Sequence, residues 1–155
     1  VQRILVTRGA GAAPPVRGLR PVAAVAPGVA AATGLSLQQL AAALVGQLRP
    51  AAVVCVDSLC SAEGQRLGRT VQFSDAGLYP AQADHTRHLT RDTLGVPVVA
   101  AGIPTLKQAQ EGADLVVTPR ALDSVIARGA ALLAGSVNRA LQPRLTVQQL
   151  CWLTG

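Results

Sequence analysis

Aromatic residues are nearly absent from this 155-residue chain, which has one Trp, one Tyr, one Phe and no Met, although half of its residues are hydrophobic. A core of ordinary size therefore has to be built from Val, Leu, Ile and Ala. Small and β-branched side chains of this kind suit parallel strands that are covered by Ala-rich helices. The composition predicts one α/β domain that spans residues 1–155.

Long apolar runs are also missing. Each run is broken by Gly, Pro or charge well short of the ~20 residues that a membrane-spanning helix needs, and no signal-peptide pattern is present. The three cysteines are an odd number without the spacing of a disulfide framework. Cysteine usage of this kind is typical of a reducing compartment. We therefore expect a cytoplasmic protein that makes no membrane contact.

Acidic residues and lysine are scarce, and the formal net charge of +6 comes from thirteen Arg and the single Lys107. A basic surface favours acidic partners, nucleic acid included. The Arg residues are scattered along the sequence, and no aromatics interleave with them to stack on bases. A GC-rich genome, in which Arg replaces Lys, explains the composition equally well, and nucleic-acid binding is the weakest of the functional interpretations.

Predicted strands and helices alternate along the chain. We expect Ser36 and Thr146 to act as helix N-caps, because their side chains can accept from the first helical N–H groups. The alternation predicts a three-layer sandwich with a mostly parallel sheet between helices. The expected strands are 21–26, 53–56, 71–73, 94–101 and 114–117, and the expected helices are 36–48, 61–67, 106–110, 120–141 and 147–153.

Two of the eight acidic residues, Asp57 and Asp75, lie at the ends of predicted buried strands. Asp57 directly follows the strand at 53–56, and Asp75 lies two residues beyond the strand at 71–73. Ligands of open α/β sheets bind outside the carboxyl ends of the strands. If the two strands are parallel neighbours, both acids share one edge, where partial burial would favour protonation of one of them. Such a pair can activate water and protonate a leaving amine. The alternatives are an Asp57 bonded to backbone N–H groups and a turn at 74–77.

Other chemistry has weaker support. His85 and His88 lie near Asp84 in a polar segment, but their spacing is loose for a metal site, and loop histidines are the simpler interpretation. Cys55 and Cys60 do not form a Cys-x-x-Cys motif. No glycine-rich phosphate loop is present. The sequence therefore predicts neither a metal nor a cofactor.

Several segments resemble, in the same order, the spore germination protease family. The match also includes the start, Leu5-Val6-Thr7-Arg8, and two downstream pieces around Thr118 and Asn138. Each piece is short, but their shared order is specific. The main pieces are Arg20-Pro21-Val22, Pro27-Gly28-Val29, Val56-Asp57-Ser58-Leu59, Gln72-Phe73-Ser74-Asp75-Ala76-Gly77-Leu78-Tyr79-Pro80, Thr93-Leu94-Gly95-Val96-Pro97-Val98-Val99-Ala100 and Gly102-Ile103-Pro104-Thr105.

The resemblance implies an aspartic-type endopeptidase, a peptide-bond hydrolase that degrades small acid-soluble spore proteins during germination. It further implies a hydrogenase-maturation-protease-like fold, a homo-oligomer activated from a zymogen, and a location in the spore core or forespore. Asp57 matches one of the family's two essential acids, and we add Asp75 as its candidate partner. Substrate contacts are expected from Ser58, Ser74, Gly77 and Tyr79.

The chain also departs from the family pattern. The family's other acid lies in a glycine-rich segment upstream of Leu5, which these residues do not include. Tyr79 replaces the usual His, and Ala81-Gln82-Ala83 replaces Gly-Ser-Gly. The chain is therefore a cleavage product that binds an N-terminal fragment, a shortened chain, or a divergent relative. The last case gives the alternative function, a catalytically impaired scaffold that binds acidic peptides or proteins.

Overall fold

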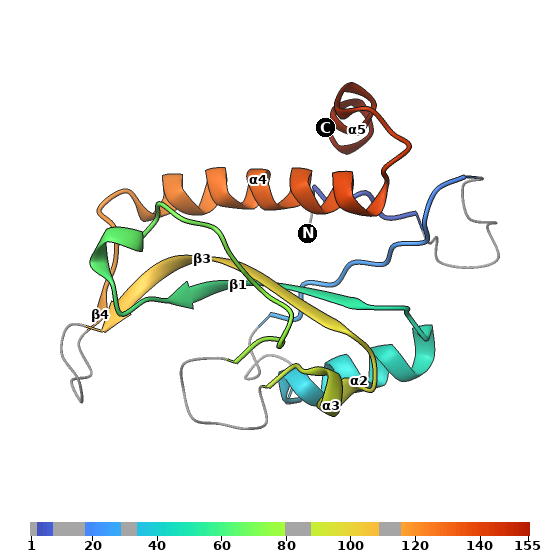
Figure 1. Cartoon of the computed structure of the whole chain (residues 1–155), viewed down its shortest axis with the longest axis horizontal. Coiled ribbons are helices and arrows are strands. Elements are labelled where there is room, and N and C mark those ends of the chain that lie inside the picture. The colour runs from blue at the N-terminus through green and yellow to red at the C-terminus, as the bar shows by residue number, and fades with distance from the viewer. Residues whose placement is uncertain (1–2, 8–17, 29–33, 80–87, 109–115) are drawn as a thin grey trace. The chain divides into compact units, whose positions relative to one another are not determined.

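The structure is a computed structural model, and it describes residues 3–7, 18–28, 34–79, 88–108 and 116–155 (Figure 1). The chain divides into two compact units. The first unit combines Val1–Ala26 with Arg128–Gly155, and the second is Pro27–Ala127. The assignment of residues 1–155 to a single domain stays a prediction.

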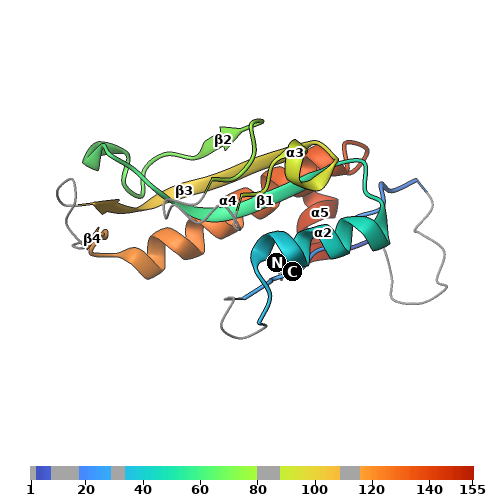
Figure 2. The same cartoon turned by 90° about the horizontal axis from the view of Figure 1, so that it is seen from below.

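A small mixed sheet forms the centre of the second unit. Its central strand β3 (Val98–Gln108) pairs in parallel with β1 (Val53–Cys60) and antiparallel with both β2 (Gln72–Ser74) and β4 (Val116–Val117). In Figure 2, β1 and β2 flank β3. The α/β class is confirmed, but the expectation of a mostly parallel sheet is wrong for the described strands. Residues 61–71 contain no crossover helix of the kind that usually connects parallel strands.

One face of this sheet carries the core. Helices α2 (Leu37–Leu48) and α3 (Arg91–Leu94) lie on that side (Figure 1). Inward-facing residues of β1 and β3 alternate along the strands, as the pleat requires. The buried cluster contains Cys55, Leu78, Leu89, Leu94, Val98 and Ala100, with partly buried Leu37, Ala41 and Val45 packed against it.

The opposite face of the sheet is partly exposed, although Ala101 on that face is buried. Val54 pairs with Val99, and Val56 and Phe73 both pair with Ala101, so these side chains share one face. Val54, Val56 and Phe73 are 40%, 53% and 65% exposed. The expectation that β1 is a buried strand is therefore wrong, since only Cys55 of its residues is buried.

Two capped helices match their predicted positions, whereas α3, which Thr90 caps, was not predicted and takes the place of the start of the strand expected at 94–101. Ser36 caps α2 and Thr146 caps α5 (Val147–Thr154), each through a capping box completed by a Gln side chain. The long helix α4 (Leu122–Leu141) begins in the second unit and continues into the first. Capping chemistry is local in sequence, and for this reason these boundaries could be predicted.

Three other predictions around the sheet are wrong. The helix expected at 61–67 is reduced to a single 3₁₀ turn, η1 (Gly64–Arg66). Strand β3 does not stop at 101 but continues to Gln108, which replaces the first half of the helix expected at 106–110. A register shift between Leu59 and Cys60 accommodates Pro104 within the ladder. Residues 109 and 110 lie outside the described part of the chain, as do 114 and 115 of the last expected strand.

Side chains, rather than a sheet, hold the N-terminal segments of the first unit. Residues 21–26 do not form the predicted strand. The amide of Asn138 accepts from the N–H of Leu5 at 2.9 Å and donates to the carbonyl of Arg3 at 2.8 Å. The amide of Gln142 likewise accepts from the N–H of Arg20 and donates to the carbonyl of Arg20. Asn138 of α4 and Gln142, the residue that directly follows α4, are both buried and therefore take the place of a neighbouring strand.

Among the described residues, no helix combines the length and the apolar character that crossing a bilayer requires.

Candidate functional site

Asp57 lies inside β1 rather than at its end, so the predicted position at the carboxyl end of a strand is wrong. It pairs with Gly102 of β3, and β1 continues to Cys60. A Cβ atom at position 102 would collide with the Asp57 carbonyl oxygen and would lie 2.6 Å from Leu59 Cγ. Glycine therefore permits the close pairing that extends the strand past the acid.

The carboxylate of Asp57 reaches the outer edge of β1. The N–H of Val53 donates to the carbonyl of Pro97, so odd-numbered residues of β1 direct their backbone groups toward β3. Ser58 then directs its N–H outward, and Asp57 Oδ1 accepts it at 2.8 Å. This is the backbone-bonded arrangement that the sequence left open as an alternative. Asp57 Oδ2 has no hydrogen-bond partner among the described residues.

Water reaches Asp57, because its side chain is exposed. The expectation of a carboxylate shielded at the rim of the sheet is therefore wrong for the described structure. The exposed second oxygen can accept a hydrogen bond from a water molecule or from an incoming peptide.

Asp57 and Asp75 are separated by the central strand. β2 ends at Ser74, directly before Asp75 and one residue later than predicted, but β3 lies between β1 and β2. Two strand spacings amount to about 10 Å. Ser74 pairs with Ala100 while Asp57 pairs with Gly102, so Asp75 is also offset along β3 by roughly 10 Å at 3.3 Å per residue. The neighbouring, parallel arrangement that would place both acids on one edge is absent.

The pKa of Cys55, two residues before Asp57 in β1, is raised. Burial in the core, and secondarily the Asp57 carboxylate, raise the pKa of the Cys55 thiol from 9.0 to about 11. A thiol in this state is a poor nucleophile, because the thiolate is the reactive form. Cys60 and Cys151 are both exposed.

The segment after β2 forms a tight turn. Ser74 Oγ accepts from the N–H of Ala76 at 3.2 Å, which matches the turn interpretation of this motif. Gly77 has φ +105°, and a Cβ atom there would collide with the Leu89 carbonyl oxygen. Glycine is thus required where the chain meets residues 89 and 90.

Tyr79 and His88 face each other beyond this turn. Leu78 and Leu89 exchange two backbone hydrogen bonds at 2.9 and 3.0 Å and turn their side chains into the core. The rings of Tyr79 and His88 then lie 5.0 Å apart and tilted. Asp84 and His85 lie outside the described residues. Within the described ranges, no group of three His, Cys, Asp or Glu side chains is placed to hold a metal.

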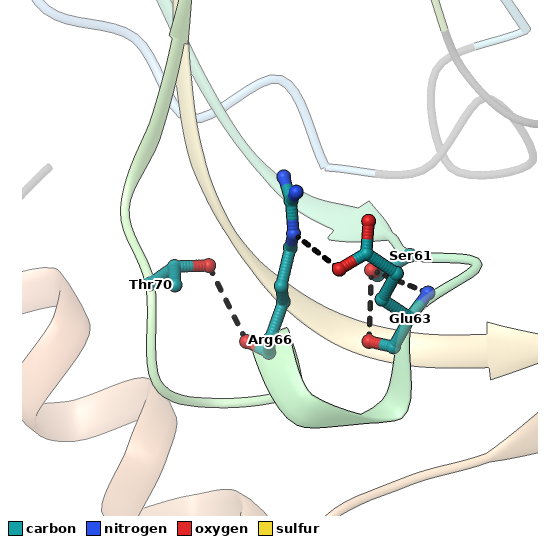
Figure 3. Close-up of polar contacts among 4 residues, drawn as sticks. All are labelled: Ser61, Glu63, Arg66 and Thr70. Atoms are coloured by element: carbon teal, nitrogen blue, oxygen red, sulfur yellow. Dashed lines mark hydrogen bonds and ion pairs between the residues drawn. The ribbon is translucent and has the colours of Figure 1, made fainter.

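The loop that follows β1 is held by its own polar residues (Figure 3). The Ser61 hydroxyl donates to the Glu63 carbonyl and accepts from the Glu63 N–H, both at 3.1 Å. Arg66 Nε lies 3.0 Å from Glu63 Oε2, and Thr70 donates to the carbonyl of Arg66 at 3.4 Å. The buried Ser61 hydroxyl is therefore engaged structurally, and it is not positioned as a nucleophile by this network.

Sequence reasoning missed a basic pocket in the first unit. A cavity of about 370 Å³ is lined by residues 18–20 and 141–144, which include Arg20 and Arg144. The two lining segments are more than 120 residues apart in the chain. One feature of the sequence could have indicated this pocket: residues 1–26 and 128–155 contain no acidic residue.

The fold and site define an α/β protein with an exposed carboxylate on a sheet strand. A family model described as germination protease matches residues 1–111, and the chain belongs to that family. Germination proteases of Clostridium perfringens (strain 13 / Type A), Halalkalibacterium halodurans and Bacillus subtilis (strain 168) are 28%, 36% and 37% identical to it.

The alignments with these three relatives cover 85%, 81% and 70% of this chain. They cover 55%, 34% and 31% of the relatives. The chain therefore spans about a third to a half of the length of the germination proteases that it matches.

Proposed function

We propose that this chain contributes a catalytic acid to an endopeptidase that cleaves small acid-soluble spore proteins. The observation that carries the proposal is the family match over residues 1–111, which includes the Asp57 segment. The relatives are germination proteases, which supports hydrolysis of a peptide bond. The exposed Asp57 carboxylate supplies a group suited to that chemistry.

In the proposed mechanism, Asp57 acts as a general base toward water. Its Oδ1 is held by the N–H of Ser58, which fixes the plane of the carboxylate. Its Oδ2 accepts a proton from a water molecule as that water attacks the peptide carbonyl carbon. The protonated acid, or a second acid, then donates a proton to the leaving amine.

Asp75 is the proposed second carboxylate. Because β3 separates it from Asp57, the two acids do not share a proton directly. If a different acid from a longer polypeptide or from a bound N-terminal fragment fills this role, Asp75→Asn will retain activity. This variant therefore separates the two sources of the second acid.

Four residues near the acids are proposed to contact the substrate. Ser58 adjoins Asp57. Ser74 is the last residue of β2, and Gly77 and Tyr79 follow this strand. We further propose that catalysis uses an aspartic-type acid pair and that the complete fold has three layers and is hydrogenase-maturation-protease-like. The protein is proposed to form a homo-oligomer and to be activated from a zymogen. It is proposed to be made during sporulation and to act during germination, in the cytoplasm of the spore core or forespore.

The decisive experiment measures cleavage of a purified small acid-soluble spore protein by the chain and by its Asp57→Asn variant, with mass spectrometry of the products. Asp57→Asn keeps the side-chain shape but removes the base, and loss of one essential acid lowers rates by orders of magnitude. Asp92→Asn, an exposed acid at the start of α3, is the matched control and should retain cleavage.

Equal cleavage by the Asp57→Asn variant and the unmodified chain would remove Asp57 from the catalytic role. Tight binding of the spore protein without cleavage by the unmodified chain would instead identify the chain as a scaffold for acidic proteins.

A further inference from the structure

The net positive charge of this protein lies in one of its two units. The first unit contains seven of the fourteen basic residues and none of the eight acidic ones, so its formal side-chain charge is +7. The second unit contains the other seven basic residues and all eight acids, so its formal charge is −1. The charge looks scattered in the sequence because the two ends of the chain combine to form the first unit.

Three arginines of the first unit gather where α4 ends. Arg20 and Arg144 line the cavity of about 370 Å³, together with Gln142 and Pro143. Arg139 Nη1 donates to the carbonyl of Pro143 at 2.9 Å, so the third guanidinium borders the same segment. Because the first unit has no acidic side chain, its own residues cannot neutralise these cations.

The backbone that carries Arg20 is held rigidly. Gln142, which is 3% exposed, bonds both the N–H and the carbonyl of Arg20, at 2.8 and 2.7 Å. Thr7 Oγ1 donates to the same carbonyl at 2.6 Å. The side chain of Arg20 is nevertheless exposed. A fixed backbone beneath an exposed guanidinium reduces the entropy cost of holding an anion.

We propose that this pocket, which Arg20 and Arg144 line and Arg139 borders, binds carboxylates of an acidic polypeptide segment. The inference rests on the proposed function, because it assigns the segment to the protein substrate. The planar guanidinium binds carboxylate oxygens in a bidentate manner. A compact cavity suits individual side chains, whereas duplex DNA is bound through phosphates spread along its length. The observations therefore favour an acidic peptide over nucleic acid.

Binding is measured by fluorescence anisotropy of a labelled peptide with alternating Glu and Ala, in the Asp57→Asn background so that nothing is cleaved. The double variant Arg20→Gln/Arg144→Gln is expected to bind about tenfold more weakly, equivalent to 1.4 kcal/mol. The control Arg69→Gln/Arg120→Gln removes the same charge from exposed positions of the second unit and should change affinity by less than about twofold. Melting curves confirm that all variants are folded.

Equal weakening by the two double variants would overturn the proposal, because it would show an effect of net charge alone. No binding of the peptide, or tighter binding of duplex DNA than of the peptide with the same dependence on Arg20 and Arg144, would also overturn it. Partial retention of affinity in Arg20→Lys/Arg144→Lys would support bidentate recognition. The anisotropy assay measures binding only. If the separate Asp57 experiment detects no peptidase activity, the result of the binding assay is unaffected.

Discussion

Gln142 is joined to Arg20 by two hydrogen bonds that involve both halves of its side-chain amide, across 122 positions of sequence. The amide oxygen accepts from the N–H of Arg20, and the amide nitrogen donates to the carbonyl. An amide side chain thereby substitutes for the backbone of a neighbouring strand, and the N-terminal segment is attached without a sheet to the residue that directly follows α4.

Gln142→Ala is expected to destabilise the first unit. The substitution removes both bonds and leaves the N–H of Arg20 without its partner, which costs about 1–3 kcal/mol. Gln148→Ala on the exposed surface of α5 is the control, and it should change stability by less than about 0.5 kcal/mol. Urea unfolding followed by circular dichroism measures both values. Similar stability of the two variants would contradict a structural role for the two hydrogen bonds between Gln142 and Arg20.

Gly102→Ala should disrupt the pairing of β1 with β3. The new methyl group would meet the Asp57 carbonyl oxygen and the side chain of Leu59, so the strands would have to separate. We expect a loss of at least about 1–3 kcal/mol, as for an overpacked core. Gly46→Ala lies in α2 with nothing within 4 Å of the added methyl group. That control should stabilise the protein by about 0.5–1 kcal/mol.

A melting temperature for Gly102→Ala equal to or above that of the unmodified chain would show that the β1–β3 register is not as described. Amide hydrogen exchange of β1 provides the local measurement, since loosened pairing exposes its N–H groups.

Stability should fall at alkaline pH because of Cys55. The pKa of the Cys55 thiol is about 11 in the folded chain, whereas the ordinary pKa of a cysteine thiol is 9.0. Between these values the unfolded state binds fewer protons, so unfolding becomes more favourable as the pH rises. The stabilisation is complete below pH 9 and is lost as the pH passes 11. Two pKa units correspond to about 2–3 kcal/mol.

The measurement compares unfolding free energies from pH 8 to pH 11 for the unmodified chain and Cys55→Ala. The difference between them should shrink across this range, since only the unmodified chain carries the linked proton. Cys60→Ala, at an exposed thiol, should follow the unmodified chain throughout. Parallel curves for the unmodified chain and Cys55→Ala would contradict the raised pKa.

Local chemistry allowed the sequence to determine several features of this protein. Ser36 and Thr146 mark helix starts because a cap bonds to groups only three residues away. The order of short motifs around Asp57 and Asp75 pointed to the germination protease family, which the comparisons confirm. The α/β class followed from the scarcity of aromatics and the alternation of apolar segments.

Tertiary structure alone decided the strand order, the surroundings of Asp57 and the distribution of charge. Insertion of β3 between β1 and β2 depends on pairings between distant residues, which periodicity in one segment does not contain. Burial of a strand depends on what covers each face, so an apolar run did not predict the exposure of Val56 and Asp57. The basic pocket exists because the two chain ends fold together, and only contacts in space bring Arg20 beside Gln142 and Arg144.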